Sequence, residues 1–153
     1  MGDEETRNVR WARNAAFWGA LVVTAFNALS AIGGGIGILL TDGLGMPESL
    51  LAGGPFTSFA LPGLVLVIVV GGSQALAAGL LIARRESALL WTAVAAVGML
   101  IWIYVEITII GGGAWLQLLY FATGIIQVVL VLALLGIIDW MPRASLRSAA
   151  TGR

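Results

Sequence analysis

Cysteine, histidine and lysine are all absent from this sequence of 153 residues. Without cysteine and histidine there are no disulfides, no thiolate or imidazole metal ligands, and no Ser/His or Cys/His nucleophile. Without lysine there is no phosphate-binding loop that ends in Gly-Lys-Ser/Thr, and no Schiff base. We therefore expect no cofactor, no metal and no catalytic residue, and an enzyme is the least favoured class of function, without being excluded.

Charge is also scarce, whereas apolar residues are abundant. Charged residues make up 10% of the chain and hydrophobic residues 59%, far from the composition of an ordinary soluble domain. Four stretches of about twenty residues or more carry almost no charge, and this is the length that an α-helix needs to cross roughly 30 Å of hydrocarbon. The sequence predicts an all-α integral membrane protein, a four-helix bundle at residues 12–140 with short tails at 1–11 and 141–153. Membrane lipid is an expected partner and nucleic acid is not.

The breaks between the apolar stretches are formed by polar, glycine and proline residues. We expect the four spans, which run up-down-up-down, at about residues 12–40, 62–83, 88–110 and 114–138. The connection between the first two is the longest, and its Pro47 predicts the start of a short surface helix that covers this face. Gly111-Gly112-Gly113 predicts the break before the last span, and Asp139, Trp140 and Pro142 predict its end.

The basic residues predict the orientation in the membrane. All eight are arginine, and in the predicted topology they fall on one side: Arg7, Arg10, Arg13, Arg84, Arg85, Arg143, Arg147 and Arg153. The opposite side offers only Asp42 and Glu48. The positive-inside rule therefore predicts that both termini and the Arg84-Arg85 turn lie in the cytoplasm.

Two patterns near the amino terminus have other interpretations. Residues 7–31 resemble a secretory signal peptide, and cleavage there would leave three spans. Because the apolar run continues to Leu40, we expect this segment to stay as the first span. Residues 1–6 match the myristoylation pattern, but the three consecutive acids from Asp3 to Glu5 argue against that modification.

Each predicted span carries polar residues on a face that also holds glycine or alanine. Polar side chains in hydrocarbon turn toward protein or water, and small neighbours let helices approach closely. Asn27, Gln74 and Gln127 lie near the middle of their spans on such faces. Either they hydrogen-bond to each other across helices, at roughly 1 kcal/mol per contact, or they line a polar pocket that orients a ligand.

Glu106 is the only charged residue well inside a predicted span. Gln117 and Tyr120 begin the last span at the same depth, Ser30 lies at a similar depth on the first, and Trp102 is one turn below Glu106. We predict that these five side chains form an outward-facing ligand pocket with Trp102 as its apolar floor, because an embedded acid is a candidate site. The alternative is that Glu106 extends to the headgroups or to a structural partner.

Residues 33–37 read Gly-Gly-Gly-Ile-Gly, so Gly33 and Gly37 have the Gly-x-x-x-Gly spacing. In an apolar helix this spacing can form a dimerisation face. It therefore predicts either a homo-oligomer through Gly33 and Gly37 or close packing within one bundle.

Several short motifs resemble those of a broad group of small four-span bacterial membrane proteins, similar to the DoxX-like group. They cover about half of the chain, from Pro62 to Ile138, and are Pro62-Gly63, Arg84-Arg85, the segment from Trp102 to Glu106, and Leu116-Gln117 with Tyr120. The resemblance implies four helices in a bacterial inner membrane and no particular reaction. The chain also looks similar to the sterol-isomerase-type membrane pocket fold, but it lacks the histidine expected there.

Three functions follow from these patterns as hypotheses. The first is the binding of a lipid or a small amphipathic ligand in the outward-facing pocket. The second is a proton-coupled transporter of small molecules that acts as an oligomer and uses Glu106, although transport sites usually lie nearer the midplane. The third is a structural or assembly subunit of a membrane complex, for which the face at Gly33 to Gly37 would matter most.

Overall fold

The structure, a computed structural model, describes residues 2–110 and 115–136. These residues form helices and turns and contain no strand. Four of the helical stretches are long and apolar enough to cross a membrane: Arg10–Thr41, Ala60–Ile82, Ala88–Ile109 and Trp115–Leu134. The prediction of an all-α protein with four membrane-spanning helices is confirmed.

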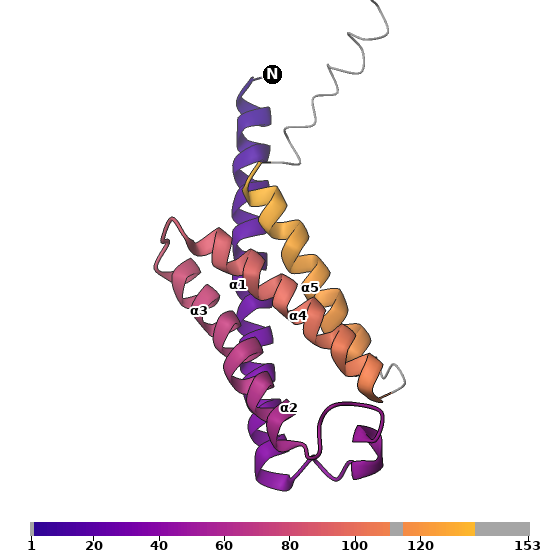
Figure 1. The fold of residues 1–153 in the computed structure, drawn as a ribbon. Helices are drawn as coiled ribbons and strands as arrows, with labels where there is room; N and C mark the ends of the chain where they lie inside the picture. The colour runs from indigo at the N-terminus through magenta and orange to yellow at the C-terminus, as the bar shows by residue number, and fades with distance from the viewer. Residues whose placement is uncertain (1, 111–114, 137–153) are drawn as a thin grey trace, which may run out of the picture.

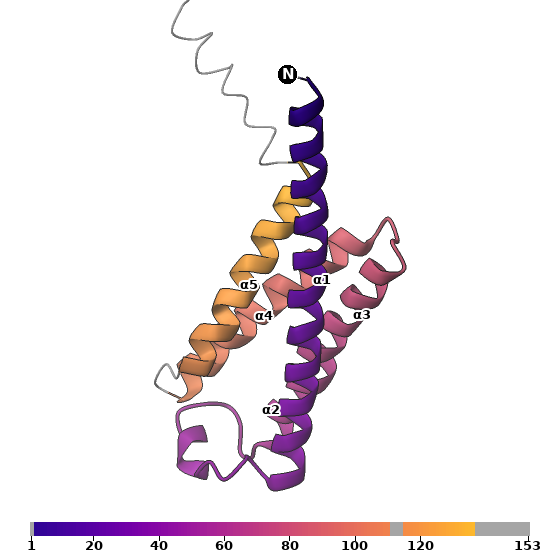
Figure 2. The same ribbon diagram turned by 180° about the vertical axis from the view of Figure 1, so that it is seen from behind.

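The first helix, α1 (Gly2–Thr41), has 40 residues and is therefore about 60 Å long at 1.5 Å per residue. This is roughly twice the thickness of the hydrocarbon core, and its first turns project beyond the other helices (Figures 1 and 2). The segment predicted as the amino-terminal tail is thus helical from Gly2 onward. The helix ends where Asp42 and Gly43 adopt positive φ angles of 49° and 101°.

The second span consists of three consecutive helical segments. These are α2 (Ala60–Val65), the π-helical η2 (Leu66–Gly71) and α3 (Gly72–Ile82). A π-helical turn widens the helix and often occurs near a functional site. Here it includes Leu66, which lines the main cavity described below.

The last two spans, α4 (Ala88–Ile110) and α5 (Trp115–Leu134), lie side by side as a hairpin (Figures 1 and 2). The predicted break at Gly111-Gly112-Gly113 lies outside the described residues, as do Asp139 to Pro142 and the tail at 141–153. The last helix ends earlier than the predicted residue 138. It stops at Leu134 because Gly136 takes a positive φ of 73°.

The long connection between the first two spans, called here the 42–59 loop, lies at the end of the bundle opposite the turn between α3 and α4 (Figure 1). The short helix predicted from Pro47 is confirmed, because Pro47 caps the 3-10 helix η1 (Glu48–Leu51). Leu51 and Phe59 of this loop are buried. The loop packs against α1, where Leu44 approaches Gly37, and against α4, where Gly54 approaches Ile109.

Large apolar side chains cover the outside of the helices. Leu29 is 75% exposed, Tyr104 71% and Leu118 70%. Soluble proteins rarely expose apolar surface on this scale, whereas in a bilayer such side chains contact lipid chains. Together with the four long apolar helices, this surface identifies a multi-pass membrane protein.

Small residues fill the contacts between the spans, as expected from the faces that combine small and polar residues. The buried alanines include Ala20, Ala31, Ala77, Ala95 and Ala96. The closest approach involves Gly35 of α1, where an added Cβ would lie 2.5 Å from Val67 Cγ2 and 2.8 Å from the Gly63 carbonyl oxygen. Only glycine fits this crossing of α1 over the second span.

Gly35→Ala is therefore expected to lower the free energy of unfolding by about 1–3 kcal/mol, the usual cost of overpacking. The matched control is Gly33→Ala, because an added Cβ there meets nothing within 4 Å. Thermal unfolding of both variants in the same detergent measures the difference. Equal melting temperatures for the two variants would contradict the tight crossing at Gly35.

Candidate functional site

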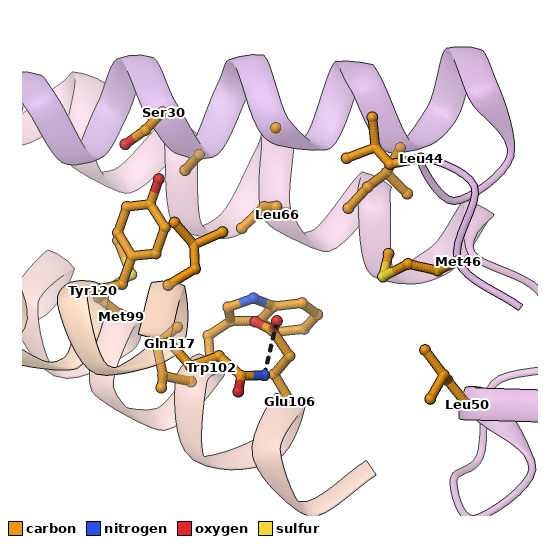
Figure 3. Close-up of a pocket in the computed structure, with 15 residues that line it drawn as sticks. Ser30, Leu44, Met46, Leu50, Leu66, Met99, Trp102, Glu106, Gln117 and Tyr120 are labelled. Carbon is orange, nitrogen blue, oxygen red and sulfur yellow. Dashed lines mark hydrogen bonds between the residues drawn. The ribbon is translucent and has the colours of Figure 1, made fainter. Parts of the chain in front are cut away.

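A cavity of about 420 Å³ lies between α1, α4, α5 and the 42–59 loop (Figure 3). Its volume falls within the roughly 300–1,000 Å³ of small-molecule pockets. Most of the side chains that line it are apolar, among them Ile38, Leu66, Met99, Ile103 and Leu116. Only a few polar groups interrupt this lining, which is the usual composition of a binding site for a mainly apolar ligand.

Glu106 and Gln117 form the polar part of one wall. Gln117 Nε2 donates a hydrogen bond of 3.2 Å to Glu106 Oε1 (Figure 3). α4 places Glu106 about one turn before its end, and α5 places Gln117 in its first turn. The hairpin thus brings the two residues together, as the sequence predicted.

Trp102 contributes an unpartnered donor to the same wall. Its indole nitrogen Nε1 is buried and has no hydrogen-bond partner among the described residues. Nearly all buried polar groups in proteins are paired, and among the described residues Trp102 Nε1 is the one buried side-chain polar atom without a partner, in a residue that lines the cavity. The sequence predicted Trp102 as an apolar floor, and the structure adds this donor to that role.

Ser30 and Tyr120 lie at the end of the cavity away from the 42–59 loop (Figure 3). The Ser30 hydroxyl donates to the carbonyl oxygen of Phe26 in its own helix, at 2.6 Å. The Tyr120 ring stacks on Phe26, with 6.2 Å between ring centroids, and its hydroxyl points toward α1. All five residues of the predicted pocket therefore line one cavity.

Asn27, Gln74 and Gln127 lie elsewhere, in a fully buried network that does not line this cavity. Gln74 and Gln127 pair reciprocally, with Nε2 to Oε1 distances of 3.2 Å and 3.0 Å. Asn27 Nδ2 donates to Gln127 Oε1 at 3.2 Å. The three amides thus hydrogen-bond to each other across helices, which is the first of the two alternatives given by the sequence. None of them lines the cavity.

Three threonines that were not predicted from the sequence extend this network. Gln127 Nε2 donates to Thr24 Oγ1 and Thr123 Oγ1 donates to Asn27 Oδ1, each at 2.9 Å. Thr92 is fully buried, and its carbonyl oxygen lies 3.4 Å from Gln127 Nε2. Helical spacing carried a signal for two of them, because Thr24 lies three residues before Asn27 and Thr123 four residues before Gln127.

The 42–59 loop supplies lining residues that the sequence did not single out. Leu44, Met46 and Leu50 line the cavity at the end opposite Tyr120 (Figure 3). A smaller cavity of about 70 Å³ continues beneath the loop and shares Trp102 and Glu106 with the larger one. The loop was predicted as a cover, but it has no periodicity from which its inward side chains could be identified.

Gly33 and Gly37 differ in their surroundings. Gly33 is exposed, and an added Cβ there would meet nothing within 4 Å, whereas at Gly37 it would lie 3.2 Å from Leu44 Cδ2. Leu44 of the same chain therefore packs over Gly37 and leaves Gly33 open. A homo-oligomer through these two glycines stays a prediction.

Comparisons with known proteins assign no family. Neither a scan against models of protein families, nor a search of curated proteins, nor a search of solved structures found a match. The resemblance to the DoxX-like group therefore stays a prediction. Among the described residues, no group of three or more aspartate, glutamate, histidine or cysteine side chains could hold a metal ion.

Proposed function

We propose that this membrane protein binds a lipid or a small amphipathic ligand in the cavity between α1, α4, α5 and the 42–59 loop. The observation that carries the proposal is the pairing of an apolar cavity with the unpartnered indole donor of Trp102. An empty apolar cavity forfeits dispersion contacts along its whole lining, and an orphaned donor adds a further cost. A ligand with an apolar body and a polar end removes both penalties.

The chemistry of the wall defines the polar end of this ligand. Trp102 Nε1 requires an acceptor, and a carboxylate such as Glu106 can accept further hydrogen bonds beyond the one from Gln117. The ligand therefore carries an acceptor beside a hydroxyl or amine donor. Its apolar body lies against Ile38 and Leu66, as an acyl chain or a compact ring system would.

Glu106→Ala is expected to weaken ligand retention about tenfold, because it removes one hydrogen bond worth about 1.4 kcal/mol to the ligand. Native mass spectrometry of gently extracted protein measures the bound fraction directly. Wild-type protein is expected to carry an additional mass that the variant loses.

The matched control for this experiment is Glu48→Ala. Glu48 is an exposed acid of the 42–59 loop that lines neither of the two cavities around Glu106. Its removal is expected to leave the retained mass unchanged. Spectra without any additional mass for both wild type and variants would overturn the proposed function.

The proposed setting is a bacterial inner membrane with both termini in the cytoplasm. The distribution of charge supports it, because the turn between α3 and α4, which contains Arg84 and Arg85, lies at the end of the bundle opposite the loop that contains Asp42 and Glu48. Since the chain has no cysteine, single cysteines can report the orientation without background. We expect an impermeant maleimide to label Glu48→Cys in intact spheroplasts and Ser87→Cys only after lysis, and the reverse pattern would contradict this orientation.

A further inference from the structure

A separate cavity of about 260 Å³ lies at the other end of the bundle, where the turn between α3 and α4 meets α1 and α5. Three arginines line it, Arg13 from α1 and Arg84 and Arg85 from the turn. Its apolar part is formed by Phe17, Leu81, Ala88, Leu89 and Leu134. The cavity shares no lining residue with the site around Glu106.

The positive charges at this cavity are not matched by acids. Among the described residues, no aspartate or glutamate lines it, and Glu86 of the same turn is exposed and not part of the lining. The guanidinium carbon of Arg84 lies 4.8 Å from the centroid of the Phe17 ring, a cation–π contact that orients the group. The positive-inside rule requires arginines on this side of the membrane, but not their convergence on one cavity.

We propose that this cavity binds the phosphate group of an anionic membrane lipid. Guanidinium groups bind phosphate oxygens in a bidentate manner, and the amino-terminal end of α4 at Ala88 adds a favourable partial charge. Basic pockets between helices at this membrane face suit anionic headgroups.

A lipid fits this cavity better than a free phosphate ion does. The floor is apolar, with Leu81 and Ala88 buried, and it offers hydrophobic contact that an isolated phosphate cannot use. The cavity also lies close to where the spans begin, at Arg10 in α1 and at Ala88 in α4. A lipid there places its phosphate among the arginines and its first chain carbons on the leucines.

The test is a titration of the full-length protein in detergent with dioleoyl-phosphatidylglycerol, followed by native mass spectrometry. Arg13→Gln and Arg85→Gln are each expected to weaken the first binding event about fivefold, since one basic residue near an anionic headgroup contributes about that factor. The control is Arg10→Gln, which removes an exposed arginine of α1 that does not line the cavity. It is expected to change the affinity less than twofold.

Three outcomes would overturn the inference. One is a loss of affinity in Arg10→Gln equal to that in the two cavity variants, which would indicate a general electrostatic attraction to the basic face rather than a specific site. Another is equal binding of dioleoyl-phosphatidylcholine, which has no net charge. The last is displacement of the lipid by millimolar inorganic phosphate, which would assign the cavity to a free ion. Both cavity variants are expected to give the same circular dichroism spectrum as the wild-type protein. This result shows that they are folded, so that a loss of affinity reports on the site.

Discussion

Gly34→Phe is expected to weaken binding of the proposed ligand about 10- to 100-fold, more than Glu106→Ala does. Gly34 lines the main cavity from α1, and an added Cβ there meets only Leu66 Cδ2, at 3.8 Å. The helix therefore tolerates the first carbon of a side chain, and the ring beyond it extends into the space that the ligand occupies. Overlap with the ligand, rather than loss of a contact, causes the decrease.

The matched control is the same substitution at the preceding residue. Gly33 is exposed and an added Cβ there meets nothing within 4 Å, so a phenylalanine at this position points toward lipid. Native mass spectrometry of Gly34→Phe and Gly33→Phe, prepared in parallel, compares the retained mass. If the two variants retain the same amount as wild type, the cavity is not the binding site.

Gln127→Leu is expected to produce a large change in stability, a decrease of about 2–3 kcal/mol in the free energy of unfolding. Gln127 pairs with Gln74, Asn27 and Thr24 in the fully buried network. Hydrogen bonds between membrane helices contribute about 0.6 kcal/mol each. The substitution also leaves buried amide groups on Asn27 and Gln74 without this partner, which adds to the cost.

Ile126→Leu is the control for this prediction, because Ile126 is the neighbouring residue on α5 and is exposed to lipid. Unfolding in increasing mole fractions of dodecyl sulfate, followed by tryptophan fluorescence, gives the free energies of both variants. A decrease in Gln127→Leu no greater than that in Ile126→Leu would show that the network does not stabilise the bundle.

The four spans were predictable because each has the length and the apolar composition that a helix needs to cross the hydrocarbon core of a membrane. A stretch of some twenty apolar residues has one stable environment. Asp42 follows the end of the first span, and Pro62 lies in the first turn of the second. The meeting of Glu106 with Gln117 was predictable for a related reason. A short connection between two antiparallel helices keeps residues near it at the same depth.

The division of the polar residues between the cavity and the network was not predictable. Helical spacing places Asn27 and Ser30 on one face of α1, yet Asn27 joins the network and Ser30 lines the cavity. The outcome depends on how far the helices separate along their length, which is set by close approaches such as that of Gly35 to Gly63. The residue pattern of a single helix carries no information about the distance between neighbouring helices.

Two further differences between the sequence-based prediction and the structure concern the end of the last span and the contacts of the 42–59 loop. The last span ends at Leu134 because Gly136 adopts a left-handed conformation, although apolar residues continue to Ile138. The 42–59 loop buries Leu51 and Phe59 without any regular spacing. Hydrophobicity alone predicts that such residues are buried, but not which neighbours they contact.

The most direct test of the binding site is an experimental structure of the protein extracted with its native lipids in mild conditions. We expect elongated density between α1, α4 and α5, with its polar end within hydrogen-bond distance of Trp102 Nε1 and Glu106. A cavity that is closed by Leu44, Met46 and Leu50 with no density inside would contradict the proposed ligand-binding function.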